Sequence, residues 1–150
     1  MNEFIVTLGW VGIYAPVALG AIASAIGCTT AGQASIGAIL DTESGYGRYI
    51  GMSAFPSTFV IYGIVVMFTL NRQVTPDNGG GLFAVGLLSG IAFLQCGIQQ
   101  GRACASAINA AKEKPEIFGL SLAPAAIVEG FAVFAFVFAL VVSAGITGGV

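Results

Sequence analysis

The sequence predicts an all-α membrane protein with four transmembrane helices, arranged as two tandem helical hairpins. Of its 150 residues, 57% are hydrophobic and only 8% are charged, whereas about a quarter of the residues of a soluble domain are charged. Four long stretches are free of charge except for one glutamate: 4–40, 49–71, 78–101 and 117–150. Each exceeds the roughly 20 apolar residues that cross a bilayer. Barrel strands are shorter and alternate in polarity, so these stretches are predicted to be helices.

We expect four helices, at about 4–40, 48–74, 80–112 and 116–147. The stretches between them carry turn chemistry, with glycines in 41–47, a proline and three consecutive glycines in 75–81, and a proline that ends 112–115. The first hairpin then spans residues 1–76 and the second spans residues 77–150.

An internal repeat relates the two hairpins. Residues 32–34 (Gly-Gln-Ala) match residues 101–103 (Gly-Arg-Ala), and Pro56 matches Pro124 after a one-residue adjustment in the turn. The chain is therefore interpreted as a duplicated hairpin. Glu129 has no acidic counterpart in the first half, so only the second hairpin carries a carboxylate inside the membrane.

The distribution of positive residues predicts the orientation. Four of the five Lys and Arg residues lie near the first and third loops: Arg48, Arg102, Lys112 and Lys114. Positive residues favour the cytoplasmic side. We therefore expect loops 41–48 and 112–116 in the cytoplasm and both termini on the opposite side, in a multi-pass protein of a bacterial inner membrane. The side chain of Arg102 is expected to extend toward the lipid headgroups.

The composition argues against several classes of function. The chain has no histidine and no basic run, so we expect no nucleic-acid partner and no histidine chemistry. Its three cysteines lie in apolar segments, where they are expected to pack rather than react. The sequence also lacks a phosphate-binding loop. We therefore expect a non-catalytic chain without a cofactor.

Small residues recur at helical spacing in the first and third helices. Such residues let helix backbones approach closely in lipid. Packing within one four-helix bundle would need only one such face on a helix, but the first helix carries more than one, which suits neighbours on several sides, as in a ring. The residues predicted to pack in this way are Gly20, Ser24, Gly27, Gly32, Gly97 and Gly101. The second and fourth helices are expected to face lipid with seven phenylalanines: Phe55, Phe59, Phe68, Phe131, Phe134, Phe136 and Phe138.

Glu129 is the candidate functional residue, about thirteen residues into an otherwise apolar helix. An unpaired carboxylate there costs about 2.5–3.5 kcal/mol on insertion scales, and such residues usually mark an ion or proton path. A protonated glutamate that only hydrogen-bonds to a neighbouring helix is the structural alternative.

Depth along the helices predicts the surroundings of this carboxylate. At about 1.5 Å per residue from the turns, Gln100 and Glu129 reach the same depth on neighbouring antiparallel helices. Thr58 and Tyr62 of the second helix reach nearly that depth. The two prolines free backbone carbonyls at a similar level. A carboxyl that is neutral in lipid and ionised beside a fixed positive charge can load and release one cation.

Several motifs resemble those of a known family: residues 127–133 (Ile-Val-Glu-Gly-Phe-Ala-Val), Phe-Pro-Ser-Thr at 55–58 followed by Tyr62-Gly63, and Gln100-Gly101-Arg102 leading to 112–116. Together with the duplicated hairpin, they resemble the duplicated proteolipid (subunit K, c-type) of bacterial and eukaryotic V-type rotary ATPases. The resemblance spans nearly the whole chain.

This resemblance implies a rotor ring of identical chains in the lipid membrane. The ring would turn against a stator subunit of the a or I type with an essential arginine, and its cytoplasmic loops would bind central-stalk subunits. The resemblance also implies an ion site at Glu129, Gln100, Thr58 and the main-chain carbonyl of Phe55. Phe59 stands where sodium-transporting relatives have a second glutamine. An aromatic ring supplies no oxygen to sodium, so we expect H⁺ to be carried, with Na⁺ as the alternative. Tyr62 is expected to orient the carboxylate or to supply another oxygen to the ion through water.

Two other classes remain open. A small multidrug or metabolite exporter of four helices also uses one membrane-embedded glutamate, but in its first helix and without a duplicated hairpin. A purely structural lipid-packing proteolipid leaves the shared depth of Glu129, Gln100 and Thr58 unexplained. A ring of many copies isolated from membranes would favour the rotor, and a dimer that binds lipophilic cations would favour the exporter.

Overall fold

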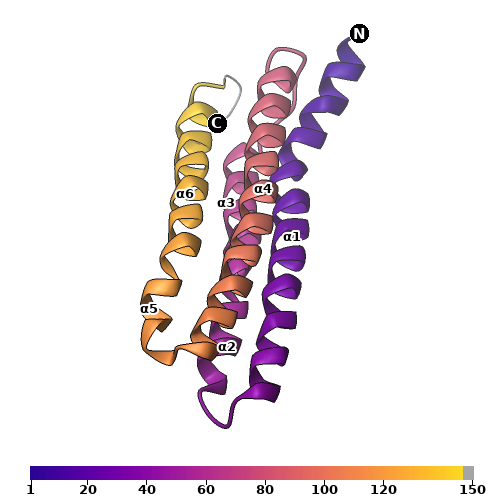
Figure 1. Cartoon of the computed structure of the whole chain (residues 1–150). Coiled ribbons are helices and arrows are strands. Elements are labelled where there is room, and N and C mark those ends of the chain that lie inside the picture. The colour runs from indigo at the N-terminus through magenta and orange to yellow at the C-terminus, as the bar shows by residue number, and fades with distance from the viewer. Residues whose placement is uncertain (147–150) are drawn as a thin grey trace.

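The computed structural model describes residues 1–146 and consists of helices packed side by side (Figure 1). Its elements in chain order are α1 (Asn2–Asp41), α2 (Tyr46–Ser53), the 3₁₀ turn η1 (Phe55–Ser57), α3 (Thr58–Leu70), α4 (Gly79–Glu113), the 3₁₀ turn η2 (Pro115–Ile117), α5 (Phe118–Ser121) and α6 (Ala123–Ala144). They form four spans that are long and apolar enough to cross a membrane: Asn2–Asp41, Tyr46–Leu70, Gly79–Glu113 and Pro115–Ala144. The predicted fold class is therefore confirmed, and the protein is an integral membrane protein.

The connections within the two hairpins lie at one end of the bundle (Figure 1). The start of α1 and the end of α6 lie at the other end. Helix α4 lies between α1 and α6 in this view, with α3 behind it. The arrangement matches the predicted order of two tandem helical hairpins with both termini at the same end. The assignment of residues 1–76 and 77–150 to separate hairpin units remains a prediction. Residues 147–150 of the second unit lie outside the described residues.

Helices α1 and α4 approach each other closely because glycines meet along their contact. A Cβ atom on Gly101 would collide with the backbone of Gly27, and one on Gly86 would collide with the backbone of Gly12. A Cβ atom on Gly27 would lie 2.6 Å from the carbonyl oxygen of Gly97. Small residues thus let these two helices pack backbone to backbone, as expected for helices in lipid.

Five of the six predicted packing residues make contacts inside the chain. Besides Gly27, Gly97 and Gly101, a Cβ atom on Gly20 would lie 2.6 Å from the carbonyl oxygen of Phe59, and Ser24 is buried. Gly32 differs, because no described atom beyond the neighbouring turns of α1 lies within 4 Å of the place where its Cβ would be. A role for these residues between copies stays a prediction.

The second and fourth spans were expected to be continuous helices, and that expectation is wrong. Pro56 lies in the 3₁₀ turn between α2 and α3, and Pro124 lies in the first turn of α6. Proline lacks a backbone N–H and clashes with the preceding turn, so each span divides there. One turn after the first break, the backbone N–H of Val60 donates to the hydroxyl of Ser24 at 3.1 Å. This bond ties α1 to the start of α3.

Both of these spans also end earlier in the sequence than expected. Helix α3 ends at Leu70 rather than 74, and α6 ends at Ala144 rather than 147, which itself lies outside the described residues. Arg72 fixes the end of α3, since its guanidinium donates to the carbonyl of Thr69 and to that of Ile146, each at 2.8 Å. In the loop between α3 and α4, the buried side chain of Asn78 accepts a hydrogen bond from the backbone N–H of Thr75 and donates one to the carbonyl oxygen of Gln73.

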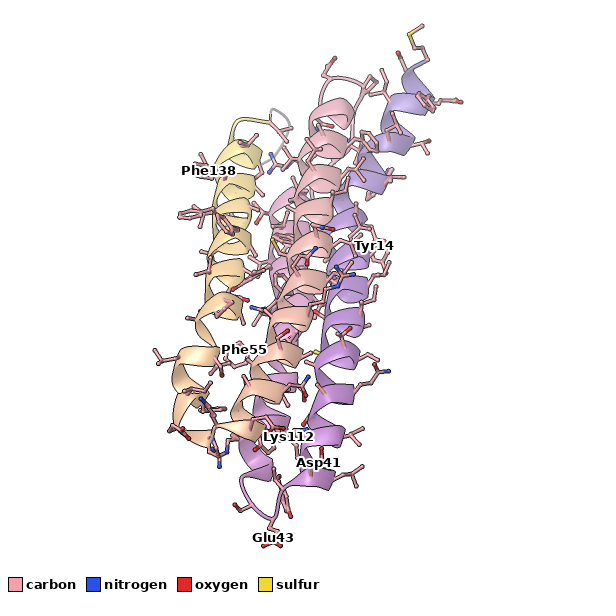
Figure 2. The ribbon with its side chains drawn as sticks, in the orientation of Figure 1. Tyr14, Asp41, Glu43, Phe55, Lys112 and Phe138 are labelled. Atoms are coloured by element: carbon pink, nitrogen blue, oxygen red, sulfur yellow. The ribbon has the colours of Figure 1, made fainter. Side chains whose placement is uncertain are left out.

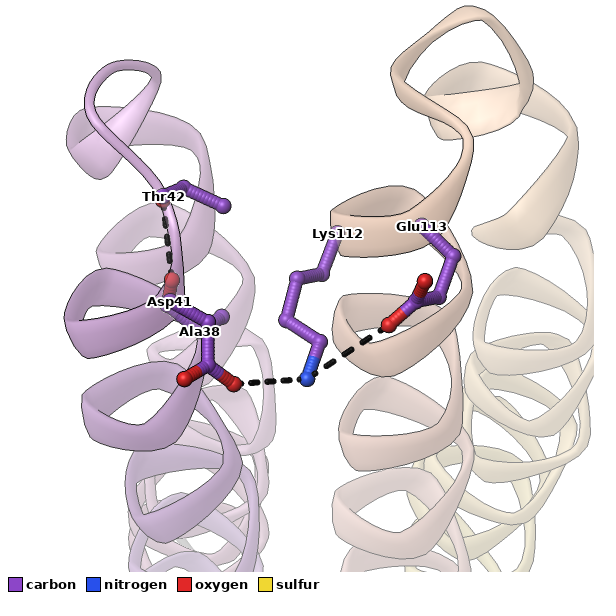
Figure 3. A network of polar contacts seen from close by, with 5 residues as sticks. All are labelled: Ala38, Asp41, Thr42, Lys112 and Glu113. Carbon is purple, nitrogen blue, oxygen red and sulfur yellow. Dashed lines mark hydrogen bonds and ion pairs between the residues drawn. The ribbon is translucent and has the colours of Figure 1, made fainter.

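Polar contacts join the two hairpins at the loop end. Lys112 Nζ lies 2.8 Å from Asp41 Oδ2 and 3.6 Å from Glu113 Oε1 (Figure 3). The guanidinium of Arg48 lies 5.8 Å from the ring centroid of Phe118. Exposed ion pairs contribute little to stability, so these contacts orient the loops more than they hold the bundle.

The outer surface carries large apolar side chains. Tyr14 and Phe138, both more than half exposed, point away from the bundle (Figure 2). Of the seven phenylalanines expected to face lipid, five are exposed: Phe55, Phe68, Phe131, Phe134 and Phe138. The expectation is wrong for Phe59, which is fully buried, and Phe136 is only half exposed.

Candidate functional site

Three hydrogen bonds converge on the carboxylate of Glu129. The Tyr62 hydroxyl donates to Oε1 at 2.5 Å, and the Thr58 hydroxyl donates to Oε2 at 3.2 Å. The amide Nε2 of Gln100 donates to the same Oε2 at 2.6 Å. The donors come from α3 and α4 and the acceptor from α6, so the site exists only where three helices meet. The structure thus brings together the four side chains that shared a predicted depth.

Helical spacing explains why these side chains face inward. Ala125 and Ala132, four residues before and three after Glu129, are fully buried, so all three lie on the inner face of α6. Thr58 and Tyr62 are four residues apart and share one face of α3. Gln100 is fully buried on α4.

The Gln100 amide is only partly satisfied. Its Nε2 also donates to the carbonyl oxygen of Ala125 at 3.2 Å, a contact that the sequence did not suggest. Its Oε1 is buried without a hydrogen-bond partner among the described residues. An unpaired buried acceptor costs about 1–3 kcal/mol. If the amide turned over, Oε1 would face the carboxyl of Glu129, where a proton or a cation would have to lie between the two oxygens.

Thr58 can serve both protonation states of the carboxyl. Its hydroxyl has one hydrogen but lies near two acceptors, Glu129 Oε2 at 3.2 Å and the carbonyl oxygen of Phe55 at 3.4 Å. Beside an ionised carboxylate it donates to Glu129. Beside a protonated carboxyl it can accept that proton and donate to Phe55 instead. The carbonyl of Phe55, which was expected to belong to the ion site, is therefore linked to Glu129 indirectly, through the hydroxyl of Thr58.

Aromatic rings close one side of the site. The ring of Tyr62 lies 5.1 Å from that of Phe136, 6.0 Å from that of Phe93 and 6.2 Å from that of Phe59, in the last case edge to face. These contacts fix the position of the Tyr62 hydroxyl. Phe59 is fully buried, and its ring lies against α4, where a Cβ atom on Gly97 would be 2.9 Å from it.

The other side of the site is open. A groove of about 370 Å³ beside Glu129 is lined by Gly51, Ala54, Phe55, Thr58 and Glu129. Glu129 is half-buried, so a polar group of another protein can approach it from this side. Within residues 1–146, no group of three or more His, Cys, Asp or Glu side chains could hold a metal ion. A cation bound here would therefore depend on neutral oxygens around one carboxylate.

Replacing Tyr62 by Phe should slow ion translocation, because the carboxylate of Glu129 loses one of its three hydrogen-bond donors. Hydrogen bonds to charged groups are worth about 1.5–3 kcal/mol, so we expect the ion flux of vesicles reconstituted with the complete complex to fall several-fold. Tyr14→Phe, the same change on the exposed face of α1, should leave the flux unchanged. An unchanged flux in Tyr62→Phe would mean that this hydrogen bond does not contribute to carrying the ion.

Comparison with known proteins agrees with the repeat. The family model for the C subunit of ATP synthase matches residues 11–70 and again 83–142, once in each hairpin. The A-type ATP synthase subunit K of Methanocaldococcus jannaschii is 33% identical over 123 residues, which cover 79% of this chain and 56% of that protein. The V-type sodium ATPase subunit K of Enterococcus hirae is 29% identical over 156 residues, which cover 96% of this chain and 100% of that protein.

The chain thus spans little more than half of the Methanocaldococcus relative and the full length of the Enterococcus relative. The family match covers both hairpins and most of the chain. The chain therefore belongs to the family of ATP synthase C subunits, as a non-catalytic V-type proteolipid subunit in which the unit of the family occurs twice.

Proposed function

We propose that the chain is the ion-carrying component of a rotor ring in the membrane sector of a V-type ATPase or ATP synthase. Each copy carries one cation on Glu129. The observation that supports this most is the convergence of Tyr62, Thr58 and Gln100 on a single carboxylate inside the membrane. A carboxyl with partners in both of its protonation states can load a cation in one environment and release it in another.

The partners follow from the open side of the site and from the loop end. A stator subunit of the a or I type would present its essential arginine to Glu129 through the groove of about 370 Å³. The loops at 41–48 and 112–116 would lie in the cytoplasm and bind central-stalk subunits, with the Asp41–Lys112 ion pair orienting the two loops relative to each other. The remaining partners are identical chains of the ring and membrane lipid.

The hydrogen-bond pattern favours a proton as the carried cation. A proton needs one acceptor besides Glu129, and Thr58 provides it. Sodium needs a nearly complete oxygen shell, but Gln100 turns its NH₂ group toward the carboxylate and Phe59 lies in the core. Sodium is the second candidate because the unpaired Oε1 of Gln100 would become a ligand if the amide turned over.

Carbodiimide labelling distinguishes the two ions, because it requires the protonated acid. Labelling of Glu129 is measured in membranes at several pH values, and at each pH the sodium concentration is raised while choline chloride holds the ionic strength constant. We expect labelling to depend on pH and to be unaffected by millimolar sodium. Strong protection by sodium, absent with choline, would assign the site to sodium. Glu129→Gln should remain unlabelled under all conditions and so reports any labelling elsewhere.

The alternative of a small exporter receives less support. Its carboxylate would lie in the first helix, whereas α1 has its only acidic residues at the two ends of the helix, Glu3 and Asp41. The family match in both hairpins also favours the rotor subunit.

A further inference from the structure

Helix α3 carries two of the three donors of the candidate ion site, but its own residues do not cap its start. Thr58 is its first residue, and Tyr62 follows about one turn later. The first backbone N–H groups of a helix have no partner inside it, and the residue before the helix often supplies one from its side chain. Ser57 stands at that place but makes no such hydrogen bond. The first turn of α3 therefore depends on partners outside the helix.

A serine of α1 provides one of these partners. The backbone N–H of Val60, the third residue of α3, donates to the hydroxyl oxygen of Ser24 at 3.1 Å, and Ser24 is buried. The third helical position is one of the two that a capping side chain usually bonds. Ser24 thus caps α3 from a neighbouring helix. Val60 stands midway between Thr58 and Tyr62, so this capping hydrogen bond holds the turn that carries both donors.

The other close contacts between α1 and this part of α3 join backbone to backbone. A Cβ atom on Gly20 would lie 2.6 Å from the carbonyl oxygen of Phe59. One on Gly63 would collide with the backbone of Pro16. Such contacts keep the helices close together, but a hydrogen bond also has a preferred direction. Among residues 1–146, the capping hydrogen bond is the only hydrogen bond between the two helices, so it best fixes α3 along its axis.

The distances in the ion site leave little room for α3 to slide. The hydroxyl of Thr58 lies 3.2 Å from Glu129 Oε2, at the long end for an O–H donor. A helix rises by about 1.5 Å per residue. A shift of α3 by one residue along its axis would therefore break this bond or displace the Tyr62 hydroxyl from Oε1. A contact that fixes α3 along its axis controls both donors.

The second repeat lacks this cap. In the repeat, Phe93 of α4 takes the place of Ser24, and Val128 of α6 takes the place of Val60. Phe93 has no hydroxyl. Val128 is the sixth residue of α6, so the helix itself supplies a partner for its N–H. The serine cap thus occurs only in the hairpin whose helix α3 donates to Glu129.

We infer that Ser24 is a positioning residue of the ion site. It accepts the N–H of Val60 and fixes α3 along its axis. The two hydroxyls that α3 brings to Glu129, those of Thr58 and Tyr62, are thereby held at hydrogen-bonding distance. Ser24 itself contributes no atom to the site. The inference rests on the proposed function and adds α1 to the helices that determine how the ion is bound.

Ser24→Ala should reduce ion flux several-fold in vesicles reconstituted with the complete complex, because alanine cannot accept the Val60 N–H. The flux is ATP-driven uptake, measured separately with H⁺ and with Na⁺. Ring yield should stay near that of the wild type, since alanine fits the same space. Ser24→Thr keeps a hydroxyl and should restore most of the flux. The matched control is Ser35→Ala, at a buried serine of α1 whose hydroxyl has no partner among the described residues. It should transport at the wild-type rate.

A double-mutant comparison separates positioning from general packing. If Ser24 acts through the donors of α3, removing one donor must diminish its effect. Ser24→Ala should therefore lower the flux by a smaller factor in a Tyr62→Phe background than in the wild type. Equal factors in both backgrounds would mean that Ser24 acts independently of the Tyr62 hydroxyl, which would overturn the inference.

Three further results would also overturn the positioning role. They are wild-type flux in Ser24→Ala, loss of rings in that variant, and intact Ser24→Thr rings with flux no higher than that of Ser24→Ala. Glu129→Gln tests the proposed function separately, because retained flux in that variant would overturn it. Background flux in Glu129→Gln together with wild-type flux in Ser24→Ala would overturn only the positioning role of Ser24.

Discussion

Glu129→Gln should reduce ion translocation to background while rings still assemble. The amide has nearly the same shape as the carboxylate but cannot ionise, so it cannot exchange a cation. Its oxygen can still accept from Gln100 and Thr58, and its NH₂ group can donate to the Tyr62 oxygen. We therefore expect the free energy of unfolding to change by no more than about 1 kcal/mol.

The measurement is ion flux in vesicles reconstituted with the complete complex, together with ring yield after purification. Glu116→Gln provides a matched control, because it makes the same chemical change on an exposed carboxylate near the loop. The control should transport at the wild-type rate. Transport near that rate in Glu129→Gln would exclude Glu129 as the ion carrier, and loss of the ring would show a structural role instead.

The position of the site along the membrane could be predicted because a helix has a fixed rise per residue. Counting from the turns placed Gln100, Glu129, Thr58 and Tyr62 at one depth, and the structure joins these side chains by hydrogen bonds. Their role in binding an ion is still a prediction. The charge-free stretches and the repeat likewise predicted the four spans and their up-and-down order.

The direction in which individual side chains point was predicted less accurately than their depth. Phe59 was expected to face lipid but is buried in the core, because nothing in a uniformly apolar helix marks its inner face. The effect of Pro56 was also misjudged, since a proline can kink a membrane helix or begin a new segment. The bonds of Ser24 to the Val60 backbone and of Gln100 to the Ala125 carbonyl have no signal in the sequence.

The small residues of α1 illustrate the same limit. Gly27 and Gly32 look alike in the sequence, and both were predicted to pack in a ring. In the structure, Gly27 meets α4 of its own chain, and Gly32 meets no described atom beyond the neighbouring turns of α1. Helical spacing gives the faces of a helix, but only the packed bundle shows which face is already occupied.

Gly27→Leu should therefore disrupt the bundle itself, and Gly32→Leu should affect only assembly. A Cβ atom on Gly27 would lie 2.5 Å from Cβ of Pro56 and 2.6 Å from the carbonyl oxygen of Gly97. Neither can move without separating α1 from α4 or shifting the turn that leads to Thr58. We expect a loss of stability of at least about 3 kcal/mol, at the upper end of overpacking effects.

Thermal unfolding in detergent and ring yield together distinguish the two variants. Gly27→Leu should lower both the unfolding temperature and the yield of rings. Gly32→Leu should keep the unfolding temperature of the single chain, because its side chain enters open space, yet prevent rings from forming because it separates α1 from the neighbouring copy. Normal stability in Gly27→Leu would contradict the close contact of α1 with α4. Normal ring yield in Gly32→Leu would mean that this face of α1 does not lie between copies.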